Sequence, residues 1–266
     1  NHNNSIFLKN KLTPIINTNI ELKKIIKTKI KFGLHIDTGI NRLGIDYRNI
    51  PNFIYDNKNI NILISHLASA DESNNNYNLI QRKRFISVIN KFKNKNIINS
   101  LSNSNGSELS KMYLFDMIRP GIALYGGNNG SKSLRKNIRP VVELKGKILQ
   151  IKKMKKEDFV GYNQTFKTNK ETTIAIISTG YADGIPRKLS NKGIVYYKNE
   201  KFRIIGRISM DSITIDISKS KYNIKEGMYI DFINYTYGIE SFAKQCHTIS
   251  NEIITSIGQR VKRFYD

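Results

Sequence analysis

The sequence lacks the features that mark membrane-spanning and secreted proteins. No stretch approaches about 18 uninterrupted apolar residues, which excludes a transmembrane helix. The first residues, NHNNSIFLKNK, contain neither a starting Met nor the apolar run of a signal peptide, so we expect the true beginning of the chain to be missing. The single cysteine, Cys246, excludes an intrachain disulfide and indicates a reducing compartment. The simplest interpretation of this thiol is an inert, partly buried side chain.

Acidic residues are scarce as well. There are 21 Asp and Glu against 44 Lys and Arg, and the formal net charge is +23. Such a balance is compatible with nucleic acid or an anionic membrane surface as a partner. The lysines are scattered, however, through segments such as KNKNI, KKMKKED and KSKYNIK, and aromatic residues are not interleaved as stacking platforms. We therefore predict a solvated lysine surface with no nucleic-acid or membrane partner, and keep a basic nucleic-acid-binding module as the least favoured alternative.

Residues 1–130 predict an α/β domain made of repeated units: an apolar run, a polar loop and a helical pattern. The apolar runs begin with LTPII (residues 12–16) and continue in FGLHIDTGINRLGID, NILISHLASADESN, NIINSLSNSNGSELSK and FDMIRPGIALYGG. A helix capped by Asn17 or Thr18 would place on its apolar side Ile20, Leu22, Ile25 and Ile26. The next helix would likewise present Leu79, Ile80, Phe85, Ile86 and Ile89. In a parallel sheet or barrel, chemistry is expected at the carboxyl ends of the strands.

About five strands can be counted in this half of the chain, whereas a complete eight-stranded α/β barrel needs roughly 250 residues. An open sheet of this kind exposes an unpaired edge and an uncovered apolar face. We therefore expect the 266-residue chain, expressed alone, to aggregate or to stay partly unfolded.

From about Val141 the pattern changes to short β-rich runs broken by Gly, Asn and Lys turns, such as TTIAIIST, SITIDIS and MYIDFINY. This pattern predicts an all-β domain over residues 131–266, with a boundary within residues 126–139. The last segment predicts a helix whose apolar side contains Ile249, Ile253, Ile254 and Ile257.

The motifs GYNQTF, TGYADGIPR and GRISMD, within Gly161–Ser212, occur at spacings that resemble the alanine racemases. The resemblance implies the C-terminal portion of a (β/α)8 barrel (residues 1–130) followed by a β domain (131–266). It also implies a cytoplasmic, homodimeric isomerase with pyridoxal 5'-phosphate as cofactor. Such an enzyme interconverts L-alanine and D-alanine, for peptidoglycan, through an aldimine and two acid/base groups.

The same resemblance assigns roles to residues around the substrate. Tyr162 would be the acid/base on one face of the substrate, acting in the neighbouring subunit's site, and Tyr181 would line the entryway, also across the dimer. The backbone N–H of Met210 would bind the substrate carboxylate. A phenol has an ordinary pKa near 10 and is a poor base at neutral pH. His66, in SHLASADE, would hydrogen-bond Tyr162 and tune its acidity.

Arg42, in DTGINRL, is implied to hold the substrate carboxylate, a task that suits the planar guanidinium. Family members often carry a lysine, modified by carbon dioxide, two residues before the Asp of this motif, where it steadies the arginine. His35 stands at that position here. Arg42 must therefore be positioned by something else, either His35 itself or a bound anion.

The segments SNSNG and RPGIALYG resemble the family's cofactor cradle. The resemblance makes Asn103 part of this cradle and places the phosphate at the hydroxyl of Ser104 and at the backbone N–H groups of Gly121 and Ile122, since convergent backbone donors bind anions well. It places Arg119 on the pyridine nitrogen. An arginine there keeps the nitrogen unprotonated, which favours simple racemisation over transamination.

Two departures from the family pattern affect activity. Asn251, in ISNEI, replaces a tyrosine that contacts the phosphate, so we expect weaker cofactor binding. The family's Schiff-base lysine lies in a motif like V-K-A-N-A-Y-G-H-G, and no such string occurs here. The resemblance covers essentially the whole chain but omits about the first third of a typical member. The favoured hypothesis is a racemase seen as its C-terminal portion, and the alternative is a truncated or degenerate homologue that keeps the cradle without racemising.

Overall fold

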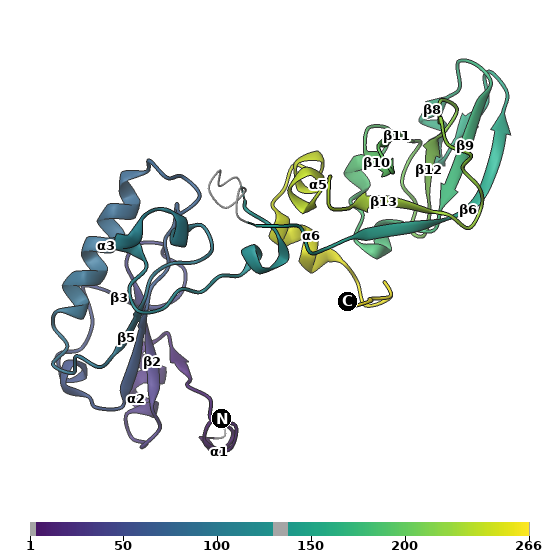
Figure 1. The fold of residues 1–266 in the computed structure, drawn as a ribbon. Helices are drawn as coiled ribbons and strands as arrows, with labels where there is room; N and C mark the ends of the chain where they lie inside the picture. Colours follow the sequence, from purple (N-terminus) through teal and green to yellow (C-terminus); the bar gives the residue numbers. More distant parts are fainter. Residues whose placement is uncertain (1–3, 130–137, 266) are drawn as a thin grey trace. The chain divides into compact units, whose positions relative to one another are not determined.

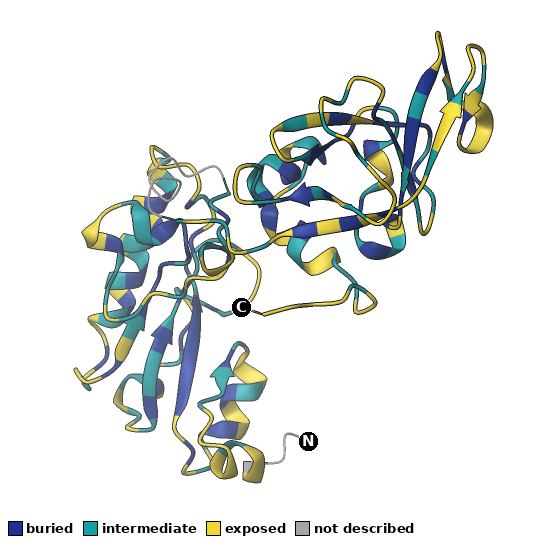
Figure 2. Ribbon diagram, turned by 45° about the vertical axis from the view of Figure 1, so that its right-hand side comes forward, coloured by how far each residue is buried: buried dark blue, intermediate teal, exposed yellow. Residues whose placement is uncertain are grey.

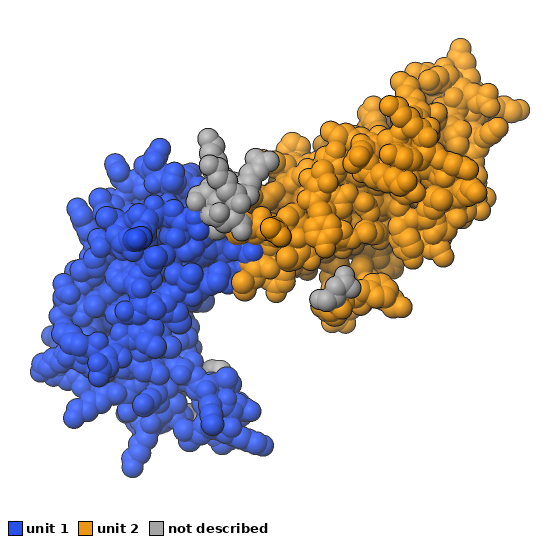
Figure 3. All heavy atoms as spheres, viewed as in Figure 1, with its two compact units in different colours: residues 1–123, 130–136 blue, residues 124–129, 137–266 orange. Residues whose placement is uncertain are grey.

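The structure is a computed structural model that describes residues 4–129 and 138–265. The described residues form two compact units, coloured separately in Figure 3. Unit 1 contains residues 4–123, and unit 2 contains residues 124–129 and 138–265. The predicted boundary between residues 130 and 131 lies outside the described residues.

Unit 1 is built on a parallel sheet (Figure 1). Its elements are α1 (Asn4–Lys9), β1 (Ile15–Ile16), α2 (Asn19–Ile25), β2 (Phe32–Asp37), β3 (Ile45–Asp46), β4 (Ile60–Ile64), α3 (Asn76–Ile89) and β5 (Ile98–Ser100), with 3-10 helices at Asn52–Asp56, Gly106–Glu108 and Lys111–Tyr113. A further 3-10 helix, Ile122–Tyr125, contains residues of both units. The strand order is β1-β2-β4-β5, with β3 paired to β2. The prediction of a parallel α/β region is confirmed.

Two of the predicted strands differ from the structure. Only the last two residues of LTPII form β1, and Leu12 is exposed. FDMIR forms no regular strand. Phe115 has a left-handed backbone (φ 52°), the next two N–H groups bond the carbonyl of Asn99, and Arg119 makes an isolated bridge to Asn103. Within the described residues β1 and β5 each pair on one side, and aggregation of the isolated chain stays a prediction.

The helix prediction was correct for the start of α2 and wrong for part of its apolar side. Thr18 is the N-cap and forms a capping box with Glu21. Leu22 and Ile25 are buried, but Ile20 is 69% exposed because it lies on the opposite face of this two-turn helix.

The apolar side of α3 was predicted correctly only in part. Phe85 is buried as expected, and Ile89 packs partly buried against the core. Leu79 and Ile80 are exposed, whereas the buried residues are Asn78, Gln81, Phe85 and Val88. The two amides are buried because they hydrogen-bond backbone groups of the loop that precedes α3. Asn78 donates to the carbonyls of Ser69 and Glu72, and Gln81 accepts from the N–H of Ala68 and donates to the carbonyl of His66. The amide nitrogens of both residues and the oxygen of Gln81 are hydrogen-bonded, so polar pairing replaces apolar packing on this face, although Oδ1 of Asn78 has no partner in the described residues.

Unit 2 contains an antiparallel barrel, closed within the described residues in the order β10-β11-β12-β9-β6-β13 (Figure 1). Its elements are β6 (Leu144–Met154), β7 (Phe159–Val160), β8 (Phe166–Lys167), β9 (Thr172–Ile177), β10 (Ile194–Tyr197), β11 (Glu200–Ile205), β12 (Ile213–Asp216), β13 (Tyr229–Ile233), α5 (Ile239–Gln245) and α6 (Ser250–Ser256), with 3-10 helices at Tyr162–Gln164, Tyr181–Asp183 and Arg187–Leu189. The predicted antiparallel β region is confirmed.

The predicted tail helix is two short helices, α5 and α6. Ile253 is buried on α6, as expected. Ile249 is 55% exposed because it is the extended N-cap residue of α6 and not part of its apolar side.

Each unit has its own apolar core, visible as dark blue segments in Figure 2. On β2, successive residues on both faces are buried, as is usual for a central parallel strand. In unit 2 the core side chains come from the barrel strands and from α5 and α6. In the described ranges, no helix combines the length and the apolar character that crossing a bilayer requires.

Candidate active site

Polar side chains of unit 1 gather at the carboxyl ends of its parallel strands. Asn17 directly follows β1, His35 and Asp37 are on β2, His66 follows β4, and Ser100 ends β5. Parallel strands end at one edge of a sheet, so residues far apart in the sequence meet there. We call these residues, with Arg42, Ser65, Asn103 and Arg119, the strand-end cluster.

Arg42 is presented by a tight turn after β2. The carboxylate Oδ1 of Asp37 accepts from the backbone N–H groups of Gly39 (2.8 Å) and Asn41 (3.2 Å). Both residues have left-handed backbones, with φ of 131° and 56°. Glycine adopts this conformation freely and asparagine tolerates it. Arg42 itself is exposed, and its guanidinium has no acceptor among the described residues.

Arg119 is held firmly in the cluster. Its Nη1 donates to the hydroxyl of Ser100 (2.5 Å), and its Nη2 donates to the carbonyl of Ser65 (2.6 Å). The Ser100 hydroxyl in turn donates to the carbonyl of Met117 (2.7 Å). Burial lowers the pKa of Arg119 from its ordinary value, although an arginine stays protonated in proteins. Sequence reasoning missed both serines, which give no motif signal beyond their position at strand ends.

His66 lies between two donors. Its Nδ1 is 3.5 Å from Nη2 of Arg119, and its Nε2 is 3.4 Å from Nδ2 of Asn103. The amide of Asn103 is oriented by its Oδ1, which accepts from the N–H of Gly106 (2.8 Å). Both neighbouring groups donate, and a neutral imidazole has one lone pair, so His66 can accept from only one of them. The charged guanidinium is the stronger donor, which favours the lone pair on Nδ1 and the proton on Nε2.

Both histidines of the cluster are neutral at pH 7. Burial, followed by the charges of Arg119, Arg42 and His35, lowers the pKa of His66 to about 4. Burial and the charges of Arg119 and Arg42 also lower the pKa of His35, against a smaller opposite effect of Asp37. The positive charge of the cluster therefore rests on its two guanidinium groups. Neither forms an ion pair within the described residues, and such a site suits an anionic ligand.

The cradle residues meet beside this cluster, with one difference from expectation. The N–H of Gly121 was expected to face the phosphate, but it donates to the hydroxyl oxygen of Ser104 (2.9 Å), which also accepts from the N–H of Ala123 (3.3 Å). Ser104 and Ile122 are buried. A Cβ added at Gly121 would meet no atom within 4 Å, so open space borders the backbone here.

Unit 2 brings together Tyr181 and Met210, two of the three motif residues predicted there. The N–H of Tyr181 donates to the carbonyl of Ser209 and that of Ala182 to the carbonyl of Met210, both at 3.1 Å. Gly180 packs so closely on the Met210 carbonyl that a Cβ would overlap it. Both side chains are about half exposed. In the described part of the chain, the Met210 N–H has no protein acceptor.

Sequence reasoning missed a hydrogen-bond network that supports the segments of Tyr181 and Met210. Asp183 accepts from the N–H of Gly180 (2.8 Å) and from Nε of Arg260 (2.7 Å). The same arginine donates through Nη2 to Asp211 (2.6 Å). Arg260 comes from the end of the chain, so no local pattern could have connected it with residues 183 and 211.

Tyr162 projects from a strained turn of unit 2. Its side chain is 66% exposed. The residue before it, Gly161, has φ 77°, and the two residues after it, Asn163 and Gln164, have φ 58° and 52°. Left-handed backbone at two successive non-glycine residues is uncommon and costs free energy. Asn251, expected near the phosphate, accepts instead through its Oδ1 from Nδ2 of Asn129 (2.7 Å) within unit 2.

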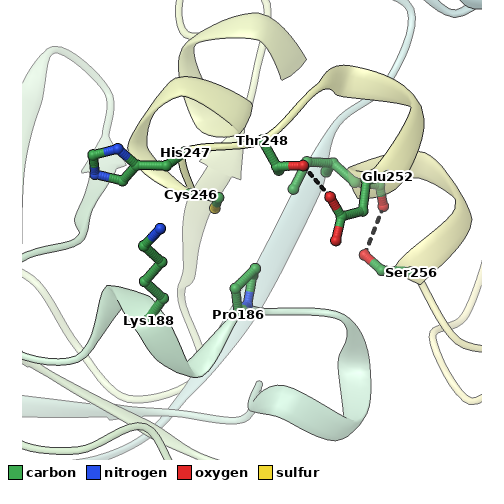
Figure 4. Close-up of a pocket in the computed structure, with 8 residues that line it drawn as sticks. Pro186, Lys188, Cys246, His247, Thr248, Glu252 and Ser256 are labelled. Atoms are coloured by element: carbon green, nitrogen blue, oxygen red, sulfur yellow. Dashed lines mark hydrogen bonds between the residues drawn. The ribbon is translucent and has the colours of Figure 1, made fainter.

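A separate pocket in unit 2 contains none of the predicted site residues (Figure 4). Cys246, Lys188, His247 and Glu252 are among the residues that line it. Burial raises the pKa of the Cys246 thiol to about 12. The thiolate, which is the reactive form, is therefore negligible at neutral pH. The prediction of an inert thiol agrees with this environment.

Comparison with known proteins identifies the family. Residues 3–129 match the family described as alanine racemase, N-terminal domain, and residues 141–265 match alanine racemase, C-terminal domain. An alanine racemase of Rickettsia africae (strain ESF-5) is 37% identical over 266 residues, covering 96% of this chain and 72% of that protein. The chain belongs to the alanine racemase family.

Other relatives agree with this assignment. Among solved structures, an alanine racemase from Bartonella henselae with covalently bound pyridoxal phosphate has a TM-score of 0.88 and 32% identity, covering 100% of this chain and 77% of that one. An alanine racemase of Rickettsia bellii (strain RML369-C) is 37% identical over 87% of this chain. The chain spans 58% of the length of that relative and 63% of an alanine racemase of Brucella abortus (strain 2308).

Proposed function

We propose that this racemase-family chain acts in the interconversion of L-alanine and D-alanine, with pyridoxal 5'-phosphate bound at the strand-end cluster. The observation that carries the proposal is the electrostatic character of that cluster. Two guanidinium groups stand at the carboxyl ends of parallel strands without a carboxylate partner in the described residues, beside two histidines that remain neutral. A site of this kind binds a phosphate and a carboxylate rather than a cation.

The residues of unit 1 fit the cofactor. The open space beside Gly121 leaves room for a ligand against the backbone. The hydroxyl of Ser104 is hydrogen-bonded to Gly121, and the N–H of Ile122 comes next along the chain. We place the phosphate there, with Asn103 at its edge. Arg119, held by Ser65 and Ser100, would donate to the ring nitrogen. Because arginine only donates, that nitrogen would stay unprotonated.

When bound, pyridoxal phosphate supplies an electron sink that acidifies the α-hydrogen of an amino acid. The remaining work belongs to the protein. Arg42 and the N–H of Met210 would hold the carboxylate, and Tyr162 would move the proton at Cα on one face. His66 would donate through Nε2 to the hydroxyl oxygen of Tyr162 and so tune its acidity. The string that carries the family's Schiff-base lysine is absent from these 266 residues, so we assign the second acid/base group to no residue of this sequence.

We further propose a homodimer in the cytoplasm, in which Tyr162 and Tyr181 act in the site of the partner subunit. The exposure of Tyr162, Tyr181 and Met210 on unit 2 supports this arrangement, because it leaves these groups accessible to a partner subunit. We also retain the domain assignment of residues 1–130 and 131–266, with the first as a portion of a (β/α)8 barrel.

The test is cofactor binding and α-hydrogen exchange on the full 266-residue chain. Titration with pyridoxal phosphate should show saturable binding that competes with inorganic phosphate. Arg119→Leu should weaken it by about tenfold or more, since hydrogen bonds to charged groups contribute about 1.5–3 kcal/mol. Arg48→Leu is the matched control, because Arg48 is an exposed arginine paired with Asp46 outside the cluster. Absence of saturable binding would refute the proposal.

The alternative, a homologue that keeps the cradle without racemising, is separated by the second measurement. L-alanine is incubated with the loaded chain in D2O, and deuterium at Cα is followed by mass spectrometry. Exchange supports the racemase. Saturable cofactor binding without exchange is expected both of an inactive homologue and of a racemase portion without its lysine; adding a lysine-bearing N-terminal piece should restore exchange only in the second case.

A further inference from the structure

His35 contains a buried atom that the described residues leave without a partner. The side chain is 8% exposed, and its Nε2 is among the buried nitrogen and oxygen atoms that have no hydrogen bond. Buried polar atoms are nearly always paired, and an exception in the middle of a functional cluster requires an explanation.

The protonation state of that atom follows from the contacts on the other side of the ring. Nδ1 of His35 is 2.8 Å from Oδ1 of Asn17. The amide of Asn17 is oriented by its Nδ2, which donates to the carbonyl of Ile15 (3.2 Å), so Oδ1 is the end that faces His35. An amide oxygen only accepts, and Nδ1 must therefore carry the proton. In the neutral ring, Nε2 of His35 is then a bare acceptor.

The donors available to Nε2 can be compared directly. The charges of two arginines act on His35, those of Arg119 and Arg42. Arg119 is already held by Ser100 and Ser65. Arg42 has no acceptor in the described part of the chain, and it stands on the turn after β2 that Oδ1 of Asp37 holds. Gly44, at the end of this turn, lies against His35, since an added Cβ would be 3.1 Å from the His35 carbonyl oxygen. Arg42 is thus the nearby cation with donors to spare.

We infer that His35 is a positioning residue whose Nε2 accepts a hydrogen bond from the guanidinium of Arg42, so that Arg42 is directed toward a carboxylate bound at the strand-end cluster. The inference rests on the proposed function for the ligand class. It also decides between the two possibilities left open by the sequence. A bound anion between the residues would face the lone pair of Nε2 and be repelled, whereas a guanidinium would be attracted.

The first experiment determines the tautomer of His35 in the full chain. Long-range proton–nitrogen NMR spectra should show His35 protonated at Nδ1 and bare at Nε2 at pH 7. On addition of propionate, a carboxylate probe, the Nε2 resonance should move toward its hydrogen-bonded position. This shift should disappear in Arg42→Gln and persist in the control Arg48→Gln. A proton found on Nε2 at pH 7 would overturn the inference.

Propionate affinity then separates positioning from a merely structural role. His35→Leu should weaken binding by about tenfold or more, the scale of a lost hydrogen bond to a charged group, while His35→Gln, which retains an acceptor, should stay within about threefold of the native chain. Binding that depends on Arg42 but is equal in all His35 variants would refute this inference and leave the proposed function standing. Binding that is independent of Arg42 would overturn both.

The pH dependence provides a readout that a structural role would not move. The charged groups that act on His35 are Arg119, Arg42 and Asp37, and His66 is its titratable neighbour. Protonation of Nε2 removes the acceptor, so propionate affinity should fall as the pH drops through the folded pKa of His35, which lies below the ordinary value of 6.5. Asn17→Asp raises the pKa of His35 and should move this fall to higher pH. An affinity that rises on acidification, or that requires chloride, would show that an anion is bound by His35 and would overturn the inference.

Discussion

Because His66 is neutral in the folded chain, the unfolding free energy of unit 1 should depend on pH. The pKa of this histidine falls from 6.5 to about 4 in the folded chain, because of burial and the charges of Arg119, Arg42 and His35. The folded pKa lies below the unfolded one, so on acidification the unfolded chain takes up the proton first. Stability is therefore unaffected above pH 6.5 and is lost progressively as the pH falls from 6.5 to 4.

The size of the effect follows from the shift. One pKa unit corresponds to 1.36 kcal/mol, so a lowering of about 2.5 units gives at most about 3.4 kcal/mol. His66 is half-buried and partly screened by solvent, which reduces the expected loss to about 2 kcal/mol. His35 acts in the same direction, since its pKa is lowered too.

The comparison of His66→Gln with the native chain isolates this contribution. Between pH 7 and pH 4 the variant should lose about 2 kcal/mol less unfolding free energy than the native chain, because carboxylate titrations are common to both and cancel. Urea unfolding is followed on the amide signals of β2 and β4, which report on unit 1. The sequence contains four histidines, so each ring can also be titrated individually by NMR.

His247→Gln is the matched control, since it removes an exposed histidine from unit 2. It should leave the pH dependence of unit 1 unchanged. An identical loss of stability in the native chain and in His66→Gln would show that His66 is not held neutral, and the electrostatic description of the cluster would fail.

Two further predictions concern unit 2 and its packing. Gly180→Ala should destabilise unit 2 by about 1–3 kcal/mol in urea unfolding, because the added methyl overlaps the carbonyl of Met210, whereas Gly121→Ala should change stability by less than about 0.5 kcal/mol, since open space receives its methyl. Equal effects would contradict the packing described here. Asp183→Asn should cost about 2 kcal/mol, because this carboxylate is 12% exposed and bonds both a backbone N–H and an arginine; Asp211→Asn, at 64% exposure, should cost less than about 1 kcal/mol. The order of the two losses, measured by the same unfolding experiment, is the test.

Local patterns in the sequence were sufficient to predict much of the secondary structure. Alternation and turn residues located the barrel strands of unit 2, and the T-x-x-E string located the start of α2. These signals are local because side-chain period and capping depend on residues within one or two turns of each other. The family motifs also indicated which residues to examine, and seven of them meet in or beside the strand-end cluster.

Tertiary structure alone decided how those residues are held. Nothing near Arg119 in sequence indicates Ser65 or Ser100, and nothing near Asp183 indicates Arg260. The burial of Gln81 in place of Leu79 follows from a loop that needs its amide, and the tautomer of His35 follows from Asn17, which comes directly after β1. Buried polar groups must find partners wherever the chain brings them, and those partners come from distant segments. Sequence thus determined which side chains the chain carries to the strand ends, and the long-range packing determined which of them accept, donate or stay neutral there.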